Sequence, residues 1–305
     1  MRNQINNMPD TIIFDIMFEN MTVQDESMSS LESEIINKLT SLLKNPDQIS
    51  QYITSLPQIA AQLLIELENE ETDFIKIESI LNKDPILAAK VLAIVNSAYY
   101  KHTSQPITNL LKAISILGLD CIISILMPVL LKGVFNINLY HFKLFGSVIW
   151  QHSLETAVLC QTLSKDQKEI NQFHCYLMGL VHDLGKVVAF QCISQNLTDT
   201  KEAPNIGSDC FKQALSQCSL KLSIQTAILW QLPKEVIKSL ELQVTNKTND
   251  LASILHLANK ISEANLMIEN NHMTLLRAIE LITNDDISKA QATQCLNKLM
   301  DLPPL

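Results

Sequence analysis

Histidine and aspartate lie next to each other at one point of this sequence. His182 and Asp183 are adjacent, and His152 lies 30 residues earlier on a segment with helical periodicity. Two antiparallel helices would bring the three side chains together, and imidazole with carboxylate is a donor set suited to a divalent transition metal. An isolated His-Asp pair also occurs as a metal-free, hydrogen-bonded pair. The residue types alone therefore allow a metal site or a purely structural polar cluster.

The same segment carries two glycines and a lysine in the order found in a phosphate-binding loop. Such a loop needs four residues between its glycines and a serine or threonine after the lysine. Here five residues separate Gly179 from Gly185, and Val187 follows Lys186. A P-loop is therefore excluded. Lys186, one turn after the His-Asp pair, is expected at the solvated end of a helix.

The elements that would have to position these side chains are helices. Apolar residues recur at helical spacing from Pro57 onward, no alternating strand pattern competes, and only 6 glycines occur where average usage would give about 20. Asp84 is expected to cap one helix, Asn96 to end it, Thr108 to open another and Gly118 to end that one. The sequence therefore predicts an all-α fold. Helices are expected at residues 31–43, 74–81, 85–95, 108–117, 120–133, 140–164, 170–191, 208–217, 221–231, 234–243, 251–267, 274–282 and 286–300.

Composition narrows the class of protein. A net charge of −9 without a dense basic stripe argues against binding to nucleic acid or to an anionic membrane surface. The longest uncharged apolar stretch, residues 121–131, is 11 residues long, whereas a membrane span needs about 20. Seven scattered cysteines without a CxxC pair suggest neither a disulfide framework nor a zinc ribbon. We therefore expect a cytoplasmic protein that does not cross a membrane.

Several motifs resemble known families. His152 together with residues 179–186 (GLVHDLGK) is similar to the HD superfamily of metal-dependent phosphohydrolases. Flanking motifs resemble the HDOD domain, the HD-related output domain of bacterial signalling proteins. These motifs are Leu56-Pro57, 84–87 (DPIL), 90–92 (KVL), 96–100 (NSAYY), Ile107, Ala113-Ile114, Leu117-Gly118 and 230–233 (WQLP). The resemblance covers roughly residues 50–265, about 70% of the chain.

This resemblance implies an all-α domain of two packed helical halves that serves as a regulatory or interaction module. The corresponding division of the chain has three parts. We expect an N-terminal helical extension at residues 1–50, the HDOD domain at 51–268, and C-terminal helices packed on that domain at 269–305.

One departure from the HD pattern concerns the last metal ligand. The superfamily has an aspartate in an Ala-Asp pair on a late helix, and this chain has Ala258-Asn259. A neutral amide is a poor replacement for an anionic ligand of a transition metal. His256, on the same helical face as Asn259, could substitute as a ligand or simply cap or line the core. Because no histidine lies between His182 and His256, the additional ligands of a two-metal phosphodiesterase site are missing.

The resemblance thus implies a degenerate metal site formed by His152, His182, Asp183 and Asn259. It leaves room for one weakly bound divalent ion, manganese, iron or nickel. The expected function is a bacterial signal-transduction or regulatory module without catalysis, which acts through a signalling partner protein or a ligand. The alternative is a metal-dependent phosphohydrolase in which Lys186 would hold phosphate, and a third option is a helical scaffold with a purely architectural cluster. The partner's identity and the oligomeric state do not follow from the sequence.

Overall fold

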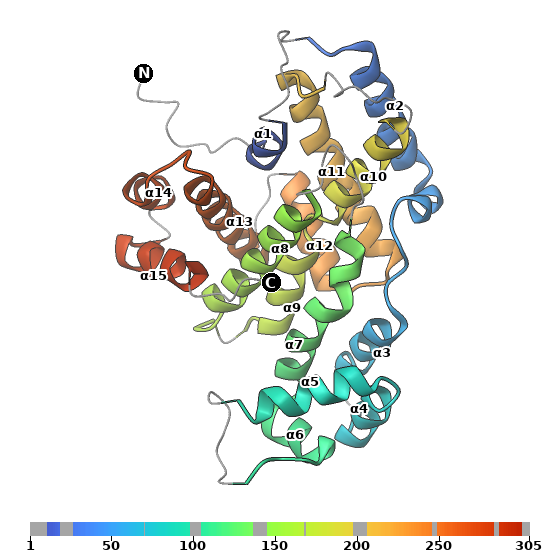
Figure 1. Ribbon diagram of the computed structural model, residues 1–305, viewed down its shortest axis with the longest axis vertical. Coiled ribbons are helices and arrows are strands. Elements are labelled where there is room, and N and C mark those ends of the chain that lie inside the picture. Colours follow the sequence, from blue (N-terminus) through green and yellow to red (C-terminus); the bar gives the residue numbers. More distant parts are fainter. Residues whose placement is uncertain are drawn as a thin grey trace. The chain divides into compact units, whose positions relative to one another are not determined.

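The computed structural model describes residues 11–18, 27–69, 71–97, 105–136, 145–167, 169–197, 206–245, 249–283 and 287–300. Within these ranges it contains fifteen α-helices, two short 3-10 helices and no strand (Figure 1). The all-α prediction is confirmed. Ala98, Tyr99 and Tyr100 of the NSAYY motif, together with His102 and His141, lie outside the described residues.

The chain divides into two compact units. The smaller unit is formed by residues 55–134, and the larger unit by residues 1–54 together with 135–305. The helices of the smaller unit are α3 (Gln58–Leu67), α4 (Phe74–Leu81), α5 (Pro85–Val95), α6 (Leu110–Leu117) and α7 (Leu119–Leu131). A 3-10 helix, η2 (Lys132–Phe135), follows α7.

Local caps shape the smaller unit. The Asp84 carboxylate accepts hydrogen bonds from the backbone N–H groups of Ile86 and Leu87 at 2.9 and 3.3 Å, as predicted for an N-cap. Gly118 ends α6 with a φ of 78°, a left-handed conformation that glycine adopts without strain. The N-cap of α6 is Asn109, which accepts from the Lys112 N–H at 2.7 Å, so the helix predicted from Thr108 begins two residues later, at Leu110.

Asn96 does more than end α5. Its amide nitrogen donates to the carbonyl oxygens of Leu92 and Ile107 at 2.7 and 2.8 Å, and its amide oxygen accepts from the Ile107 N–H at 2.7 Å. One side chain therefore satisfies the backbone of its own helix end and of a segment eleven residues later. The two hydrogen bonds between Asn96 and Ile107 hold the chain close to α5 before α6 begins.

The larger unit contains the remaining helices. They are α1 (Ile12–Phe18), α2 (Ser30–Lys44), η1 (Pro46–Gln51), α8 (Phe145–Leu163), α9 (Gln172–Val181), α10 (Leu184–Leu197), α11 (Asp209–Leu229), α12 (Lys234–Val244), α13 (Asp250–Glu269), α14 (Leu275–Ile282) and α15 (Lys289–Met300). Helices α9 and α13 pack on α8, α10 packs on α11, and α14 and α15 pack on α13. The Phe14 ring of α1 is fully buried and stacks on Phe190 of α10, with 6.1 Å between ring centroids.

Two predicted helix boundaries in the larger unit were wrong. The segment expected as one helix over 170–191 is two, α9 and α10, separated by a turn at His182 and Asp183. His182 itself keeps a helical backbone conformation, with φ −58° and ψ −28°, so the interruption of the helix is short. Conversely, the helices expected at 208–217 and 221–231 form one helix, α11, because no glycine or proline interrupts residues 218–220.

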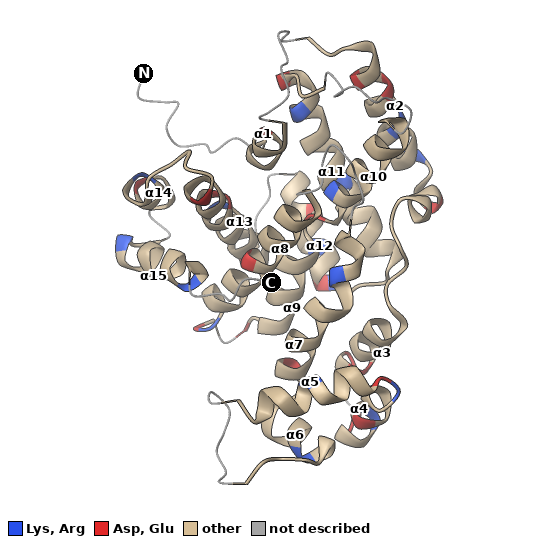
Figure 2. Ribbon diagram, viewed as in Figure 1, with Lys and Arg blue, Asp and Glu red and all other residues tan. Residues whose placement is uncertain are grey.

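Lysine, arginine, aspartate and glutamate residues are distributed over the described helices (Figure 2). In the described part of the chain, one continuous stretch, Gln172–Leu197, is long and apolar enough to span a membrane, and 89% of its most apolar window is buried inside the fold. Leu110–Leu117 and Leu119–Phe135 are long and apolar enough to span a membrane only when they are counted together. The two segments are bent by 107° relative to each other. A mostly buried stretch of this kind is also what the core helix of a globular domain looks like. The compartment in which the protein works stays a prediction.

Candidate metal centre

Three helical elements of the larger unit position the predicted site residues. His152 lies in the middle of α8, His182 and Asp183 form the turn between α9 and α10, and Asn259 lies on α13. Because α9 and α13 both pack on α8, the four side chains converge. All of them except Asn259 are buried.

Two glycines allow this close packing. A Cβ at Gly179 would lie 2.6 Å from the Cα of Ala157, so α8 and α9 approach each other backbone to backbone. A Cβ at Gly185 would collide with the carbonyl oxygen of Ser219 on α11. The two glycines of the GLVHDLGK segment therefore have a packing role on either side of the His-Asp turn, and no phosphate-binding role is needed to explain them.

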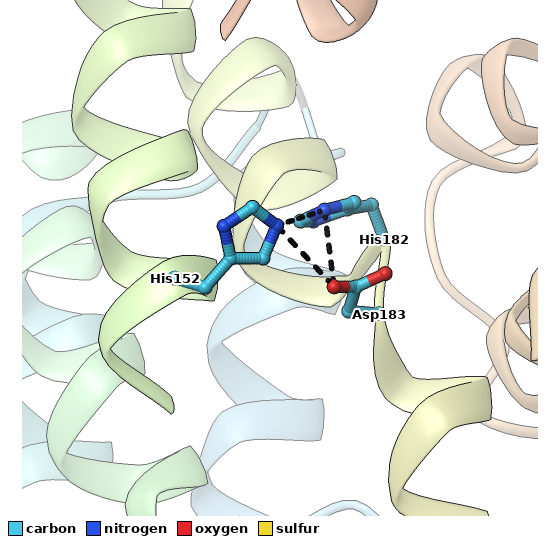
Figure 3. A group of neighbouring side chains, drawn as sticks. All are labelled: His152, His182 and Asp183. Carbon is cyan, nitrogen blue, oxygen red and sulfur yellow. Dashed lines mark hydrogen bonds and ion pairs between the residues drawn. The ribbon is translucent and has the colours of Figure 1, made fainter. Parts of the chain in front are cut away.

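The two imidazoles and the carboxylate point toward one another (Figure 3). The Nε2 atoms of His152 and His182 are 3.2 Å apart, and they lie 3.4 and 3.5 Å from Oδ2 of Asp183. The Oδ1 atom of Asn259 lies 3.0 Å from Nε2 of His152 and 2.9 Å from Nε2 of His182. Asn259 is thus where alignment with the HD pattern predicts it, facing the trio.

The spacing of these four atoms fits a single cation. Ligand atoms held about 2.1 Å from a metal ion lie about 3.0 Å apart in octahedral geometry and about 3.4 Å apart in tetrahedral geometry. The five separations given above run from 2.9 to 3.5 Å. The donor set of two imidazole nitrogens, one carboxylate oxygen and one amide oxygen therefore fits a divalent ion in size, although it carries a single negative charge.

Lys186 is placed differently from the prediction. It was expected at a solvated helix end, but it is buried, and its Nζ lies 2.6 Å from both carboxylate oxygens of Asp183. The cause is that α10 is buried on all sides at this point, since Leu184 to Phe190 have almost no exposed surface. Asp183 consequently has an internal cation as its partner before any metal binds.

Burial dominates the protonation of the cluster. It lowers the pKa of His152 to about 3, and it lowers the pKa of His182 as well, so both rings are neutral at pH 7. Burial alone would raise the pKa of Asp183, but the neighbouring His182, the close ammonium of Lys186 and His152 hold that pKa well below its usual range. The cluster therefore contains one carboxylate, one ammonium and two neutral rings.

The other histidines in the described residues lie outside this cluster. His256 is exposed on α13, so it neither substitutes as a ligand of the trio nor lines the core. The exposure has a simple helical reason, because Asn259 and Ser262 share the face of α13 that turns toward α8, and His256 lies off that face.

A second polar group, next to the trio, was not foreseen from the sequence. Glu155 on α8 and Ser262 and Asn265 on α13 are buried, and Gln151 and Glu269 lie beside them. Burial raises the pKa of Glu155 to about 7, and the nearby Glu269 carboxylate acts in the same direction. The available signal was the three-residue spacing from His152 to Glu155 and from Asn259 through Ser262 to Asn265, which places polar side chains on one face of each helix.

Comparison with solved structures identifies the fold. A protein from Shewanella amazonensis SB2B named as a metal-dependent phosphohydrolase is 16% identical, with a TM-score of 0.60 over 90% of this chain and 100% of its own. An HDOD domain protein of unknown function from Geobacter sulfurreducens is 17% identical, with a TM-score of 0.59 over 87% and 94%. A protein from Marinobacter aquaeolei VT8 named for signal transduction is 18% identical, with a TM-score of 0.55 over 92% of this chain and 65% of its own.

A comparison with curated protein sequences gave no match. The family model of the HDOD domain matches residues 53–245, which is more than half of the chain. This range contains the His152, His182 and Asp183 trio and ends before Asn259. Together with the shared helical fold, the match establishes that this chain belongs to the HDOD domain family.

Proposed function

We propose that this protein is a regulatory module of bacterial signal transduction that acts by binding a protein or a ligand, and that it does not hydrolyse phosphodiesters. Its HD cluster is a degenerate site that holds at most one divalent ion, weakly. We infer manganese, iron or nickel as the ion, a cytoplasmic location, and a signalling protein as the partner. The family and the name of the Marinobacter neighbour support the signalling role.

The observation that carries the proposal is Asn259. Its amide oxygen occupies the fourth corner of the donor set, within 3.0 Å of both Nε2 atoms. The amide brings no charge, and the one carboxylate, Asp183, already has Lys186 at 2.6 Å. Because the formal charges of Asp183 and Lys186 cancel, a divalent ion would enter a buried site without a compensating anion, which costs free energy.

Catalysis by this family of sites depends on a firmly held ion. When bound, a divalent ion would supply Lewis acidity and an activated water. His152, His182 and Asp183 would hold it, with the Asn259 amide as a neutral fourth donor. Because the site lacks one negative charge, a divalent ion would occupy it only part of the time. Such occupancy does not support steady hydrolysis of a phosphodiester.

The name of the Shewanella amazonensis neighbour and the retained trio favour a second candidate, a metal-dependent phosphohydrolase. The deciding experiment measures hydrolysis of bis(p-nitrophenyl) phosphate and of cyclic dinucleotides by the purified chain with added Mn²⁺. Wild type and Asp183→Ala are expected to give the same background rate, together with a metal content well below one ion per chain by elemental analysis. Turnover by wild type that Asp183→Ala abolishes would overturn the proposal in favour of the hydrolase.

A further inference from the structure

Glu155 is a buried carboxylate that the metal cluster does not use. It lies one turn after His152 on α8 and is 3% exposed. Its Oε1 accepts hydrogen bonds from the amide nitrogens of Gln151 at 2.9 Å and Asn265 at 3.1 Å. Its Oε2 accepts from the hydroxyl of Ser262 at 2.7 Å.

These contacts determine where the Ser262 proton points. Above its raised pKa the Glu155 carboxylate is ionised and accepts hydrogen bonds only. Ser262 then donates its single proton to Oε2 of Glu155 at 2.7 Å in preference to the His152 carbonyl oxygen, which lies 3.5 Å away. The Nδ1 atom of His152 lies 2.9 Å from the same Ser262 oxygen. With its proton already committed, that oxygen can only accept from His152, so Nδ1 of His152 carries the N–H.

We propose that Glu155 is a positioning residue that acts through Ser262 to hold His152 in the Nδ1–H tautomer, which leaves a bare Nε2 lone pair facing the cluster. A neutral imidazole carries one N–H, so a proton on Nδ1 excludes one on Nε2. The relay has three members, the Glu155 carboxylate, the Ser262 hydroxyl and the His152 ring. The inference adds to the proposed weak cation site, but it concerns the metal-free protein and stands whether or not an ion binds.

Without this relay the surroundings of Nε2 would favour the opposite tautomer. Nε2 of His152 lies 3.0 Å from the Asn259 amide oxygen and 3.4 Å from Oδ2 of Asp183, and both oxygens are acceptors. A proton on Nε2 would find a partner there, so the relay determines which of the two tautomers is present.

A backbone carbonyl favours the same tautomer, Nδ1–H, at His182. Its Nδ1 lies 2.7 Å from the Gly179 carbonyl oxygen, which can only accept, so its Nε2 is bare as well. Both imidazoles thus present lone pairs to one point before a cation arrives. In many metal sites a carboxylate or carbonyl orients the ligand histidine in this way, and here a serine is interposed between the carboxylate and the ring.

The experiment reads the tautomer directly in metal-free protein. Long-range ¹H–¹⁵N correlation spectra of ¹⁵N-histidine-labelled protein distinguish a protonated ring nitrogen from a bare one, and the His152 signals are assigned by their loss in His152→Gln. At pH 8.5 we expect wild-type His152 to be protonated at Nδ1. Wild-type His152 protonated at Nε2 would overturn the proposal without any further variant.

Glu155→Gln should reverse the tautomer. The amide oxygen of the new side chain is favoured toward the two donors on Gln151 and Asn265, which leaves its NH₂ group to donate to Ser262. Ser262 would then donate to Nδ1 of His152, and the ring proton would move to Nε2. Ser262→Ala should give the same result by removing the acceptor for Nδ1–H, and it provides a second variant in case Glu155→Gln does not fold.

Glu269→Gln is the matched control. Glu269 accepts hydrogen bonds from the same two amides, Gln151 at 2.9 Å and Asn265 at 3.2 Å, and it is not a member of the relay. We expect the His152 tautomer in this variant to match wild type. An unchanged tautomer in both Glu155→Gln and Ser262→Ala would overturn the proposal.

Metal titration provides a second readout. Loss of a partner that orients a metal-binding histidine typically weakens metal affinity about 10- to 100-fold. We expect Ni²⁺ and Mn²⁺ to bind Glu155→Gln about tenfold more weakly than Glu269→Gln. If neither variant nor wild type binds these ions, the weak cation site fails while the tautomer measurement still tests the relay.

Discussion

Two buried carboxylates in the larger unit are satisfied in opposite ways. Glu32 on α2 accepts from the backbone N–H groups of Ser29, Gly207 and Ser208 and from the Ser208 hydroxyl, at 2.7 to 3.0 Å. Asp183 receives hydrogen bonds from Lys186, while its other close neighbours are the Nε2 atoms of two neutral imidazoles. Only donors face the Glu32 carboxylate, whereas Asp183 faces one donor, Lys186, together with two imidazole nitrogens.

The difference separates a structural anchor from the proposed cation site. Burial opposes ionisation of Glu32, yet the backbone donors of Ser208, Ser29 and Gly207 outweigh it and lower its pKa. Glu32 therefore joins the start of α2 to the start of α11 with no unmet requirement. The cluster around Asp183 has lone pairs without protons, an arrangement that a cation would complete.

The largest effect is expected at the anchor. Glu32→Ala removes the partner of four donors on two chain segments, and leaving buried donors unpaired costs about 1 to 3 kcal/mol each, partly relieved by water. We expect the free energy of unfolding in urea to fall by about 3 to 4 kcal/mol. Glu34→Ala on the exposed face of the same helix is the control, and an equal loss in both variants would contradict the anchoring role of Glu32.

Asp183→Ala should come next in size. It leaves the buried Lys186 ammonium without its partner, and removing one member of a buried pair costs about 1 to 3 kcal/mol. We expect a lower melting temperature than that of wild type or of Asp166→Ala, a variant at an exposed loop position. A melting curve unchanged from wild type would show that the Asp183–Lys186 pair adds nothing to stability.

Much of the fold was predictable from local signals. Helical periodicity, the scarcity of glycine and the caps at Asp84 and Gly118 predicted the all-α architecture, because these signals act within a few residues. The position of Asn259 opposite the trio followed from family resemblance. The break at His182 did not follow, because no glycine or proline in residues 180–184 indicates it.

The relay residues were missed for a related reason. Glu155 and Ser262 are 107 residues apart in sequence, and their contact depends on how α8 and α13 are aligned along their lengths. A three-residue polar spacing is equally typical of a solvated helix face, so the sequence alone does not distinguish the two. The burial of Lys186 had a clearer signal, since apolar residues occupy both sides of it through residues 184–190.

The free energy of unfolding should depend on pH through Glu155. Folded Glu155 has a pKa of about 7 against 4.5 in the unfolded chain, so between these values the folded state binds the extra proton. Stability contributed by this group is present below pH 4.5 and is lost as pH rises through 7. His152, with its pKa lowered to about 3, acts in the opposite direction between pH 3 and 6.5, so wild type alone would show only the net effect.

Comparison with Glu155→Gln isolates the carboxylate. Glu155 faces Glu269, Gln151, Ser262 and Asn265, and of these only Glu269 is an acidic residue. As pH rises from 5 to 8, we expect the variant to gain stability relative to wild type by on the order of 2 kcal/mol, measured by urea unfolding at each pH. Parallel pH profiles for the two proteins would contradict the raised pKa of Glu155.

The smallest effect tests what Asn259 withholds from the cluster. Asn259→Asp adds one negative charge with almost no change in volume, beside two bare imidazole nitrogens. Carboxylates attract a divalent ion through a poorly solvated site more strongly than amides do, so Mn²⁺ affinity should rise about tenfold, or about 1.4 kcal/mol. The same charge repels Asp183 in the metal-free protein and should raise the pKa of one of the two carboxylates and lower the melting temperature.

Calorimetric titration with Mn²⁺ measures the affinity, and melting of the metal-free forms measures the stability. His256→Asp, which adds a charge on the exposed face of α13, controls for general electrostatic attraction. Tighter binding together with a less stable metal-free state would show that the fourth corner of the donor set lacks only a charge. Equal affinities and equal melting temperatures would mean that Asn259 does not act on the trio, and the contrast with the Glu32 anchor would then rest on Lys186 alone.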